Sequence, residues 1–246
     1  MARITDDAIV LRRWEFSETS QTVLLLTRTL GAVRGLAKGA LRPTGTFGGG
    51  FEPMTAGHVG LVTRDGRDLA TLTEWQVEQV WWPLRQRLHA LRHAMWGIDL
   101  AGRMMAEHDP HPAVFDALHL LLTALSGGSN ADAAMVSFQW TLLDAIGHRP
   151  VVDRDVRSGE SLPDDVEVLH FSVRDGGLSA VAGPDDLRVR RQTASALDAV
   201  ASGADPLALQ PDDRKRCARL LAAWARGLIG DETAALTWLY PDLPRR

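Results

Sequence analysis

The apolar pattern of this chain changes at Trp81-Trp82-Pro83, and this change limits the folds open to it. Before that point, short runs of β-branched and apolar residues alternate with turn-forming segments, a pattern typical of strands. After it, apolar residues recur at three- and four-residue intervals, as they do in amphipathic helices. The sequence therefore predicts an α+β protein whose strands and helices lie in separate domains.

The N-terminal part contains five predicted strands. They are Ala8–Phe16, Gln21–Arg28, Ala32–Lys38, Met54–Thr63 and Asp68–Val80. Short strands joined by Gly-rich connections favour a small closed barrel, and the OB-fold is the common five-stranded solution. We therefore assign residues 1–80 to an OB-fold barrel.

The remaining residues, 81–246, are predicted to form a mainly helical domain. The expected helices are Leu84–Met105, Pro112–Leu125, Ala131–Ile146, Gln192–Ala201 and Pro211–Leu228. Residues 148–188 differ, because they are rich in Asp, Arg, Gly and Pro and contain one credible strand, Val166–Val173. We expect these residues to form a small, irregular and loosely structured lobe inserted in the helical domain.

Composition argues against membrane and disulfide-rich classes of protein. No stretch approaches the roughly 20 apolar residues that span a bilayer, and the N-terminus lacks the apolar run of a signal peptide. The single cysteine, Cys217, cannot form an internal disulfide or, alone, a thiolate zinc site. We expect a soluble cytoplasmic protein in which Cys217 is a small buried side chain.

A local cationic strip stands out in a chain whose net charge is −4. No Asp or Glu occurs between Glu18 and Glu52, and the cations of this stretch are Arg28, Arg34, Lys38 and Arg42. In a strand, Arg34 and Lys38 project from one face about 13 Å apart, a spacing that suits neighbouring phosphates of a nucleic acid. The alternative is a solvated strand edge whose charges oppose edge-to-edge association.

Aromatic residues add a second candidate feature, because an exposed ring can stack on a base. Trp14 lies beside Arg12 and Arg13 and is the best placed, whereas we expect the other tryptophans to pack in the core. The candidate nucleic-acid site therefore consists of Arg12, Arg13, Trp14, Arg28, Arg34, Lys38 and Arg42. Two further cationic runs, Arg188–Arg191 and Arg214–Arg219, are either additional contacts or ordinary solvated surface.

Support for an enzyme is weak, and we predict no catalytic residues. His89 and His93 have the spacing of two metal ligands on a helix, but the Glu of a zinc-protease helix is missing. A metal-dependent hydrolase using these two together with His108 and His111 would lack any recognisable motif. The chain also contains no phosphate-binding loop, dinucleotide fingerprint or nucleophile elbow.

Several motifs, taken in order, resemble the RecO family of recombination mediators. In the barrel they are Ala8-Ile-Val-Leu-Arg-Arg13, Glu18-Thr-Ser-Gln-Thr-Val-Leu-Leu-Leu-Thr27, Gly31-Ala-Val-Arg-Gly-Leu-Ala-Lys-Gly39 and Asp68-Leu-Ala-Thr-Leu-Thr-Glu74. Beyond it they are Phe115 with Leu118 and Leu121-Leu122, Leu142-Leu-Asp-Ala-Ile-Gly-His-Arg-Pro150 and Phe171-Ser-Val-Arg-Asp-Gly-Gly-Leu178. The resemblance covers nearly the whole chain.

The resemblance implies a non-enzymatic protein of DNA repair and recombination. Its OB-fold would bind single- and double-stranded DNA, and Arg34, Lys38 and Arg42 fall on the family's basic motif. Such proteins anneal complementary strands and, with RecR, help load RecA onto DNA coated by single-strand-binding protein, whose C-terminal tail is an expected partner. A cytoplasmic, nucleoid-associated location follows. The alternative is a protein–protein adaptor with weak or no DNA binding of its own.

One departure from the family concerns its zinc-binding lobe. Where the resemblance places zinc cysteines, this chain has Asp155, Ser158, Ala180 and Gly183. Without thiolates a tetrahedral site cannot close, so we predict no zinc and no other cofactor. A surrogate site from His148, Asp153, Asp155 and His170 is an alternative with poorer ligands. We expect packing of Val168, Phe171 and Leu178 to hold the lobe, or the lobe to be partly mobile.

Overall fold

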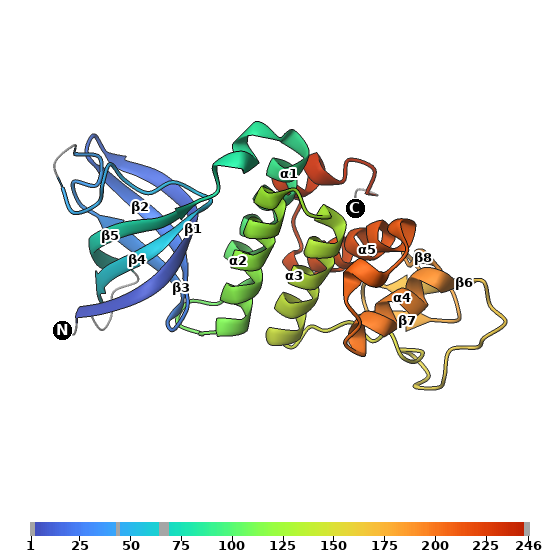
Figure 1. The fold of residues 1–246 in the computed structure, drawn as a ribbon. Coiled ribbons are helices and arrows are strands. Elements are labelled where there is room, and N and C mark those ends of the chain that lie inside the picture. The colour runs from blue at the N-terminus through green and yellow to red at the C-terminus, as the bar shows by residue number, and fades with distance from the viewer. Residues whose placement is uncertain (1–2, 43–44, 64–68, 244–246) are drawn as a thin grey trace. The chain divides into compact units, whose positions relative to one another are not determined.

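The computed structural model describes residues 3–42, 45–63 and 69–243. The chain divides into two compact units, Met1–Gly127 and Gly128–Arg246. Unit 1 holds the strands drawn in blue to teal in Figure 1 together with the helices α1 and α2, and unit 2 holds the remaining elements. Each unit has its own arrangement of secondary structure, described in turn below.

Unit 1 begins with a closed five-stranded barrel, as predicted. Its strands are β1 (Arg3–Ser17), β2 (Ser20–Thr27), β3 (Gly31–Ala37), β4 (Thr55–Val62) and β5 (Ala70–Val80). The strand order is β1-β2-β3-β5-β4, and β4 closes the barrel by pairing with β1. The β3–β5 pair is parallel and the others are antiparallel. Asp68, at the predicted start of the last strand, lies outside the described residues.

The segment Ala8–Leu11 of β1 and most of β2 are buried on both faces, which explains their nearly continuous apolar sequence. Ala8 and Val10 point into the barrel core, where Phe51 stacks on Trp75 with ring centroids 5.0 Å apart. The alternate side chains Leu11 and Leu24 pack outside the barrel against α1 (Leu88–Met104). Gly102 allows this approach, because a Cβ there would lie 3.2 Å from a methyl carbon of Leu24. Unit 1 is therefore a barrel with a helix packed on its wall.

The prediction of one continuous helix over Leu84–Met105 is wrong. A short 3₁₀ helix, Trp82–Gln86, comes first, Arg87 is extended with φ −126° and ψ 102°, and α1 starts at Leu88. Two anchors explain the break. The buried indole of Trp81 donates a 3.1 Å hydrogen bond to the Thr123 hydroxyl, and Arg87 donates one of 2.9 Å to the carbonyl of Leu125, both near the end of α2 (Pro112–Gly127).

Unit 2 contains the remaining helices. They are α3 (Ala131–Ala145), α4 (Arg191–Ala201), the 3₁₀ turn Pro206–Ala208, α5 (Pro211–Ile229) and α6 (Ala234–Leu239). The buried amide of Gln139 donates a 3.0 Å hydrogen bond to the carbonyl of Ala218, which joins α3 to α5. The sequence did not predict α6, a single short helix whose first turn is capped by the Thr233 hydroxyl. No helix in the described part of the chain is long and apolar enough to cross a membrane.

The lobe of unit 2 is more regular than predicted. It contains a three-stranded sheet of order β7-β6-β8, built from β6 (Val168–Ser172), β7 (Gly177–Ser179) and β8 (Leu187–Arg190). The strands β7 and β8 are too short to show a period in the sequence, so only β6 was expected. Phe171 and Leu178 are buried, as predicted, whereas Val168 is only half-buried and its neighbour Leu169 lies in the core. The Phe171 ring packs edge-on against Trp224.

Cys217 is fully buried in α5, as predicted. Its thiol lies 3.7 Å from the carbonyl oxygen of Thr193, to which it can donate a weak hydrogen bond. Burial raises the pKa of the thiol to about 12. At neutral pH the group is therefore a protonated packing atom rather than a nucleophile.

Gly31 provides the first test of this architecture. Its φ is +76°, and a Cβ there would lie 2.4 Å from the carbonyl oxygen of Asp109. We expect Gly31→Ala to destabilise unit 1 by at least about 1–2 kcal/mol, lowering Tm by roughly 2–4 °C per kcal/mol. Gly48→Ala is the control, because its φ of +57° is similar but nothing lies within 4 Å. Equal losses of Tm in the two variants would contradict the close approach of Asp109.

Candidate nucleic-acid interface

The turn that follows β3 holds the end of the cationic strip in place. It covers Lys38 to Leu41 and is bound to the β1–β2 turn by two backbone N–H groups. That of Gly39 donates a 3.2 Å hydrogen bond to the Ser20 hydroxyl, and that of Leu41 donates one of 3.0 Å to the Thr19 carbonyl. Gly39 has a φ of +72°, which a residue with a side chain rarely adopts. The turn is thus fixed on the barrel.

Lys38 is the first residue of this turn, Arg42 directly follows the turn, and both are exposed. Neither has a carboxylate within ion-pair distance among the residues that the structure describes. The sequence placed Lys38 inside the strand with Arg34, but β3 ends at Ala37, because the chain turns at Gly39. Lys38 is therefore on a turn, and both charges are available to an anion from solution.

Arg34 does project outward from β3, but it already has an anionic partner. Its Nε lies 2.8 Å from the Glu107 carboxylate. The segment after α1 brings this carboxylate close, because the N–H of Ala32 donates to the carbonyl of Ala106 and that of His108 donates to the carbonyl of Ala32. No carboxylate lies near Arg34 in the sequence, but the fold brings the Glu107 carboxylate next to it.

The other predicted cations are paired as well. Arg12 binds the Asp99 carboxylate, which also accepts a 3.1 Å bond from Arg103. Arg13 lies 2.8 Å from a carboxylate oxygen of Glu52. Arg28 lies 2.8 Å from Asp116 and stacks over the Phe115 ring at 5.7 Å. Of these carboxylates Asp99 is nearly buried, so Arg12 supports the packing of α1 on β1.

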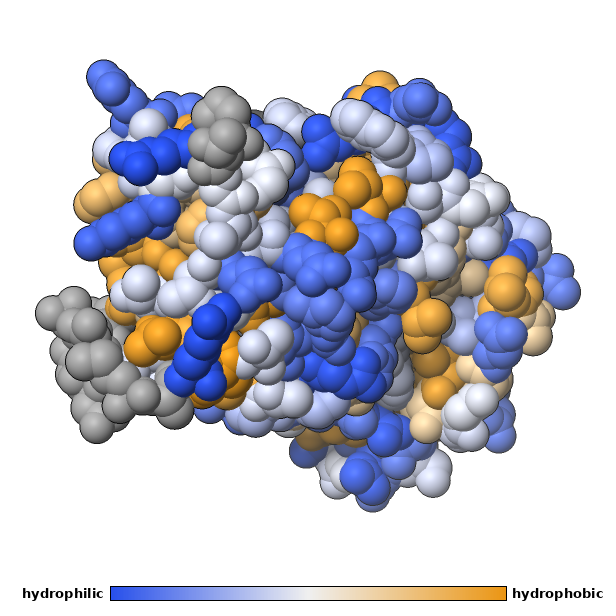
Figure 2. Space-filling view, turned by 60° about the vertical axis from the view of Figure 1, so that its left-hand side comes forward, coloured by the Kyte–Doolittle hydropathy of each residue, from blue (hydrophilic) through white to orange (hydrophobic). Residues whose placement is uncertain are grey.

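Two aromatic side chains are exposed near the far end of β1. Trp14 is 44% exposed, as the candidate site requires, and Phe16 is 63% exposed. Phe16 was not among the predicted site residues, although alternation along a strand would have placed it on the face of Trp14. Figure 2 turns the barrel side of the molecule forward, where hydrophilic side chains share the surface with small apolar areas.

A groove of about 480 Å³ runs along Trp14 between β1 and α1. Its apolar lining is Leu11, Pro53, Met54, Leu91, Met95 and Ile98. Arg12, Arg13, Arg85 and Glu52 supply the charged part of the lining. An apolar floor beside guanidinium groups is suited to a ring system attached to an anion.

Two tryptophans differ from the prediction that they pack in the core. Trp82 is 62% exposed and Trp238 is 59% exposed. The guanidinium of Arg85 lies 5.0 Å from the Trp82 ring, so this ring is partly covered by a cation rather than by apolar side chains. Trp82 begins the 3₁₀ turn at the break before α1, where its neighbour Trp81 takes the buried position.

Unit 2 carries the second group of cations. Arg188 and Arg190 on β8 and Arg216 and Arg219 on α5 line one pocket of about 230 Å³. Arg216 and Arg219 are paired with Asp213 at 3.1 Å and Asp242 at 3.8 Å. Within the described chain Arg188 and Arg190 have no such partner. The two cationic runs noted in the sequence thus meet in space.

The histidines do not form a metal site within the described residues. His89 and His93 have ring centroids 4.4 Å apart, and the Nδ1 of His93 hydrogen-bonds the carbonyl of His89 at 2.8 Å. No group of three or more His, Cys, Asp or Glu side chains suited to a metal ion occurs in the described ranges. Neither the four-histidine hydrolase nor the surrogate zinc site finds support in these residues.

The pairing pattern makes a stability prediction. We expect Arg12→Met to lower the free energy of unfolding by about 1–2 kcal/mol, because it removes a charged hydrogen bond to nearly buried Asp99. Lys38→Met should change it by less than about 0.5 kcal/mol, because Lys38 has no such contact. Urea titration followed by circular dichroism measures both. Equal stability of the two variants would show that the Arg12–Asp99 contact does not stabilise the fold.

Comparison with known proteins assigns the chain to a family. The family model for the recombination protein O N terminal matches residues 1–81, and that for the C terminal matches residues 85–236. The DNA repair protein RecO of Salinibacter ruber is 32% identical over 97% of this chain and 90% of its own length. That of Anaeromyxobacter sp. strain K is 29% identical over 97% of this chain and 96% of its own length. The chain belongs to the RecO family of DNA repair proteins.

Proposed function

We propose that this protein binds single- and double-stranded DNA through its barrel and anneals complementary strands. The observation that carries this proposal is the pair of exposed, unpaired cations Lys38 and Arg42 on a turn fixed to the barrel. Because the chain belongs to a DNA repair family, DNA is the polyanion that we expect these charges to bind. Trp14 and Phe16 add exposed rings for base stacking.

The proposed mechanism needs charge and shape but no chemical step. Lys38 and Arg42 would contact phosphates directly, whereas Arg13, Arg28 and Arg34 would first exchange an exposed carboxylate for a phosphate. Phosphate contacts carry no sequence information, so binding should show little sequence preference. Two strands neutralised on one surface repel each other less, which lets base pairing proceed. We accordingly propose that the protein is not an enzyme and needs no cofactor.

Further parts of the proposal rest on the family alone. We propose that the protein acts with RecR to help load RecA onto DNA coated by single-strand-binding protein, with the C-terminal tail of the latter as a contact. A cytoplasmic, nucleoid-associated location follows from binding to chromosomal DNA.

A protein–protein adaptor with little DNA binding is the second candidate. It is favoured by the number of barrel arginines that are already paired with carboxylates. The two functions differ in salt dependence, because counterion release makes DNA binding weaken steeply with salt.

Charge reversal at the turn tests the main proposal. We expect Lys38→Glu/Arg42→Glu to weaken binding of a labelled single-stranded oligonucleotide at least about tenfold and to flatten the salt dependence by roughly two charge equivalents. Fluorescence anisotropy at several salt concentrations measures both quantities.

The control for this experiment is Arg149→Glu/Arg154→Glu, which changes the net charge equally in unit 2. These arginines are exposed and lie 3.9 Å and 3.7 Å from Asp144 and Asp153. Unchanged affinity in the turn variant, or equal loss in the control, would contradict a barrel site. Loss in Arg188→Glu/Arg190→Glu alone would move the DNA site to unit 2.

Removal of a competing carboxylate should have the opposite effect. Glu107→Gln frees Arg34, so we expect oligonucleotide affinity to rise about two- to fivefold and the salt slope to steepen by about one. Glu15→Gln removes the same charge from an exposed position on β1 and controls for the general potential. An equal rise in both variants would show that Arg34 makes no direct phosphate contact.

A further inference from the structure

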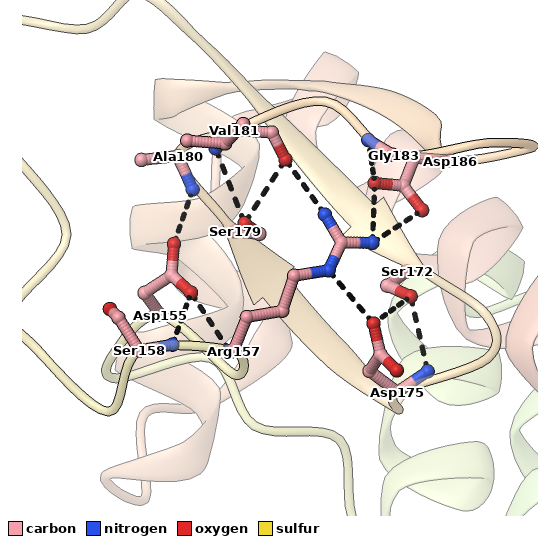
Figure 3. Close-up of polar contacts among 10 residues, drawn as sticks. All are labelled: Asp155, Arg157, Ser158, Ser172, Asp175, Ser179, Ala180, Val181, Gly183 and Asp186. Carbon is pink, nitrogen blue, oxygen red and sulfur yellow. Dashed lines mark hydrogen bonds and ion pairs between the residues drawn. The ribbon is translucent and has the colours of Figure 1, made fainter.

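The four lobe positions where the RecO resemblance places zinc cysteines do not suit a metal here. Asp155 is the only one with a strong ligand side chain, and its carboxylate is already engaged. It accepts backbone N–H bonds from Arg157 at 2.8 Å, Ser158 at 3.1 Å and Ala180 at 2.7 Å. A carboxylate that accepts three hydrogen bonds from two separate turns already joins them, as Figure 3 shows.

The side chain of Arg157 connects three other segments of the lobe. Its Nε donates to Asp175 at 2.8 Å, its Nη1 to the carbonyl of Val181 at 2.8 Å, and its Nη2 to both carboxylate oxygens of Asp186 at 2.9 and 3.0 Å. Figure 3 shows the guanidinium pointing between these three oxygen-bearing groups. One cation thus binds oxygen atoms from three points of the lobe, in the planar arrangement that only a guanidinium offers.

The two carboxylates around Arg157 are themselves held in place. The Ser172 hydroxyl donates to Asp175 at 2.8 Å. The N–H of Gly183 donates to Asp186 at 2.7 Å, and the Asp186 side chain is 3% exposed. A nearly buried carboxylate is costly without a cation, so Asp186 depends on Arg157.

Gly183 makes room for the guanidinium. A Cβ at this position would lie 2.5 Å from Nη2 and 2.9 Å from Cζ of Arg157. Any side chain at 183, including a cysteine, would therefore displace the arginine. The Arg157 guanidinium can occupy its position only because residue 183 has no side chain.

We propose that the guanidinium of Arg157 replaces a metal ion as the central cation of this lobe, so that the lobe folds without zinc. Asp155 and Asp186 join the same turns through the backbone of Ser158, Ala180 and Gly183 that metal ligation would join. The fold of the lobe is consequently insensitive to zinc supply and to thiol oxidation.

The carboxylates respond to their partners in the expected direction. Burial alone would raise the pKa of Asp155, but hydrogen bonds from three backbone N–H groups and from the Ser179 side chain outweigh this and hold the pKa below its ordinary value. The Ser172 hydroxyl and then Arg157 lower the pKa of Asp175 from the same ordinary value. Carboxylates with lowered pKa stabilise the fold above pH 3.8, and this contribution is lost as pH falls through their native pKa values.

Hydrogen exchange of the intact protein tests the proposal. Protein purified and kept in a strong chelator should retain protected amides at Ala180, Gly183 and Ser158. Arg157→Lys and Arg157→Met should speed their exchange about tenfold or more, while amides in β1–β5 stay unchanged. Arg154→Met is the matched control, because among the described residues the ion pair of exposed Arg154 is with Asp153, at 3.7 Å, outside the Arg157 network. Stoichiometric zinc in the protein, loss of protection in chelator, or unchanged exchange in the Arg157 variants would each overturn the proposal.

A converse variant gives an independent readout. Arg157→Ala combined with Asp155→Cys, Ser158→Cys, Ala180→Cys and Gly183→Cys should bind one zinc ion per chain and recover the protection that Arg157→Ala alone loses. Elemental analysis and hydrogen exchange with and without zinc measure this. Failure to bind zinc, or binding without recovered protection, would show that the arginine network does not occupy the place of a metal.

Discussion

The packing of α1 on the outer wall of β1 and β2 is the contact on which the rest of unit 1 depends. It buries the outward side chains Leu11 of β1 and Leu24 of β2, which approach Gly102. The chain leaving α1 then pairs with the start of β3 at Ala32. This route brings Asp99 to Arg12 and Glu107 to Arg34. This helix and the segment after it therefore contribute both to the packing of the barrel wall and to the pairing of two barrel cations, Arg12 and Arg34.

The barrel cations looked alike in the sequence, but in the described part of the chain some pair with carboxylates and others do not. Arg12 and Arg28 lie on the barrel but bind carboxylates that come from α1 and α2. Lys38 lies on the turn after β3 and Arg42 directly follows it, and neither is paired with a carboxylate among the residues that the structure describes. A protein with net charge −4 can thus present a small cationic site without a basic surface overall. Such a site gives binding that depends strongly on salt.

The local patterns of the sequence predicted most of the barrel and most of the helices. The short apolar runs of β1 and β2 and the three- to four-residue spacing in α2, α3 and α5 depend only on neighbours along the chain. The ion pairs could not be predicted in this way, because Arg34 and Glu107 are distant in sequence and meet only through the tertiary fold. The prediction for the lobe was incomplete for a similar reason. In the sequence, Asp155 and Gly183 were interpreted as positions where zinc cysteines are missing. The contacts of Arg157 in this lobe depend on the tertiary fold, so the sequence did not indicate that Arg157 could replace the metal ion.

An arginine paired with a carboxylate occurs in both units, but the carboxylates differ in exposure. In unit 1 the exposed carboxylate of Glu107 pairs with Arg34, and under the proposed function a phosphate would compete for this arginine. In unit 2 the nearly buried Asp186 holds Arg157 permanently, because an unpaired buried carboxylate would be costly. Exposure of the carboxylate therefore separates an arginine that can change partner from one that keeps the fold.

The chain contains only two lysines, Lys38 in unit 1 and Lys215 in unit 2, which allows a direct test of where DNA binds. An oligonucleotide with an abasic aldehyde forms a Schiff base with a nearby lysine, borohydride reduction traps it, and peptide mapping identifies the lysine. A barrel site predicts the adduct on Lys38, decreasing as salt is raised. An adduct on Lys215 alone, or none at either lysine at low salt, would contradict the account.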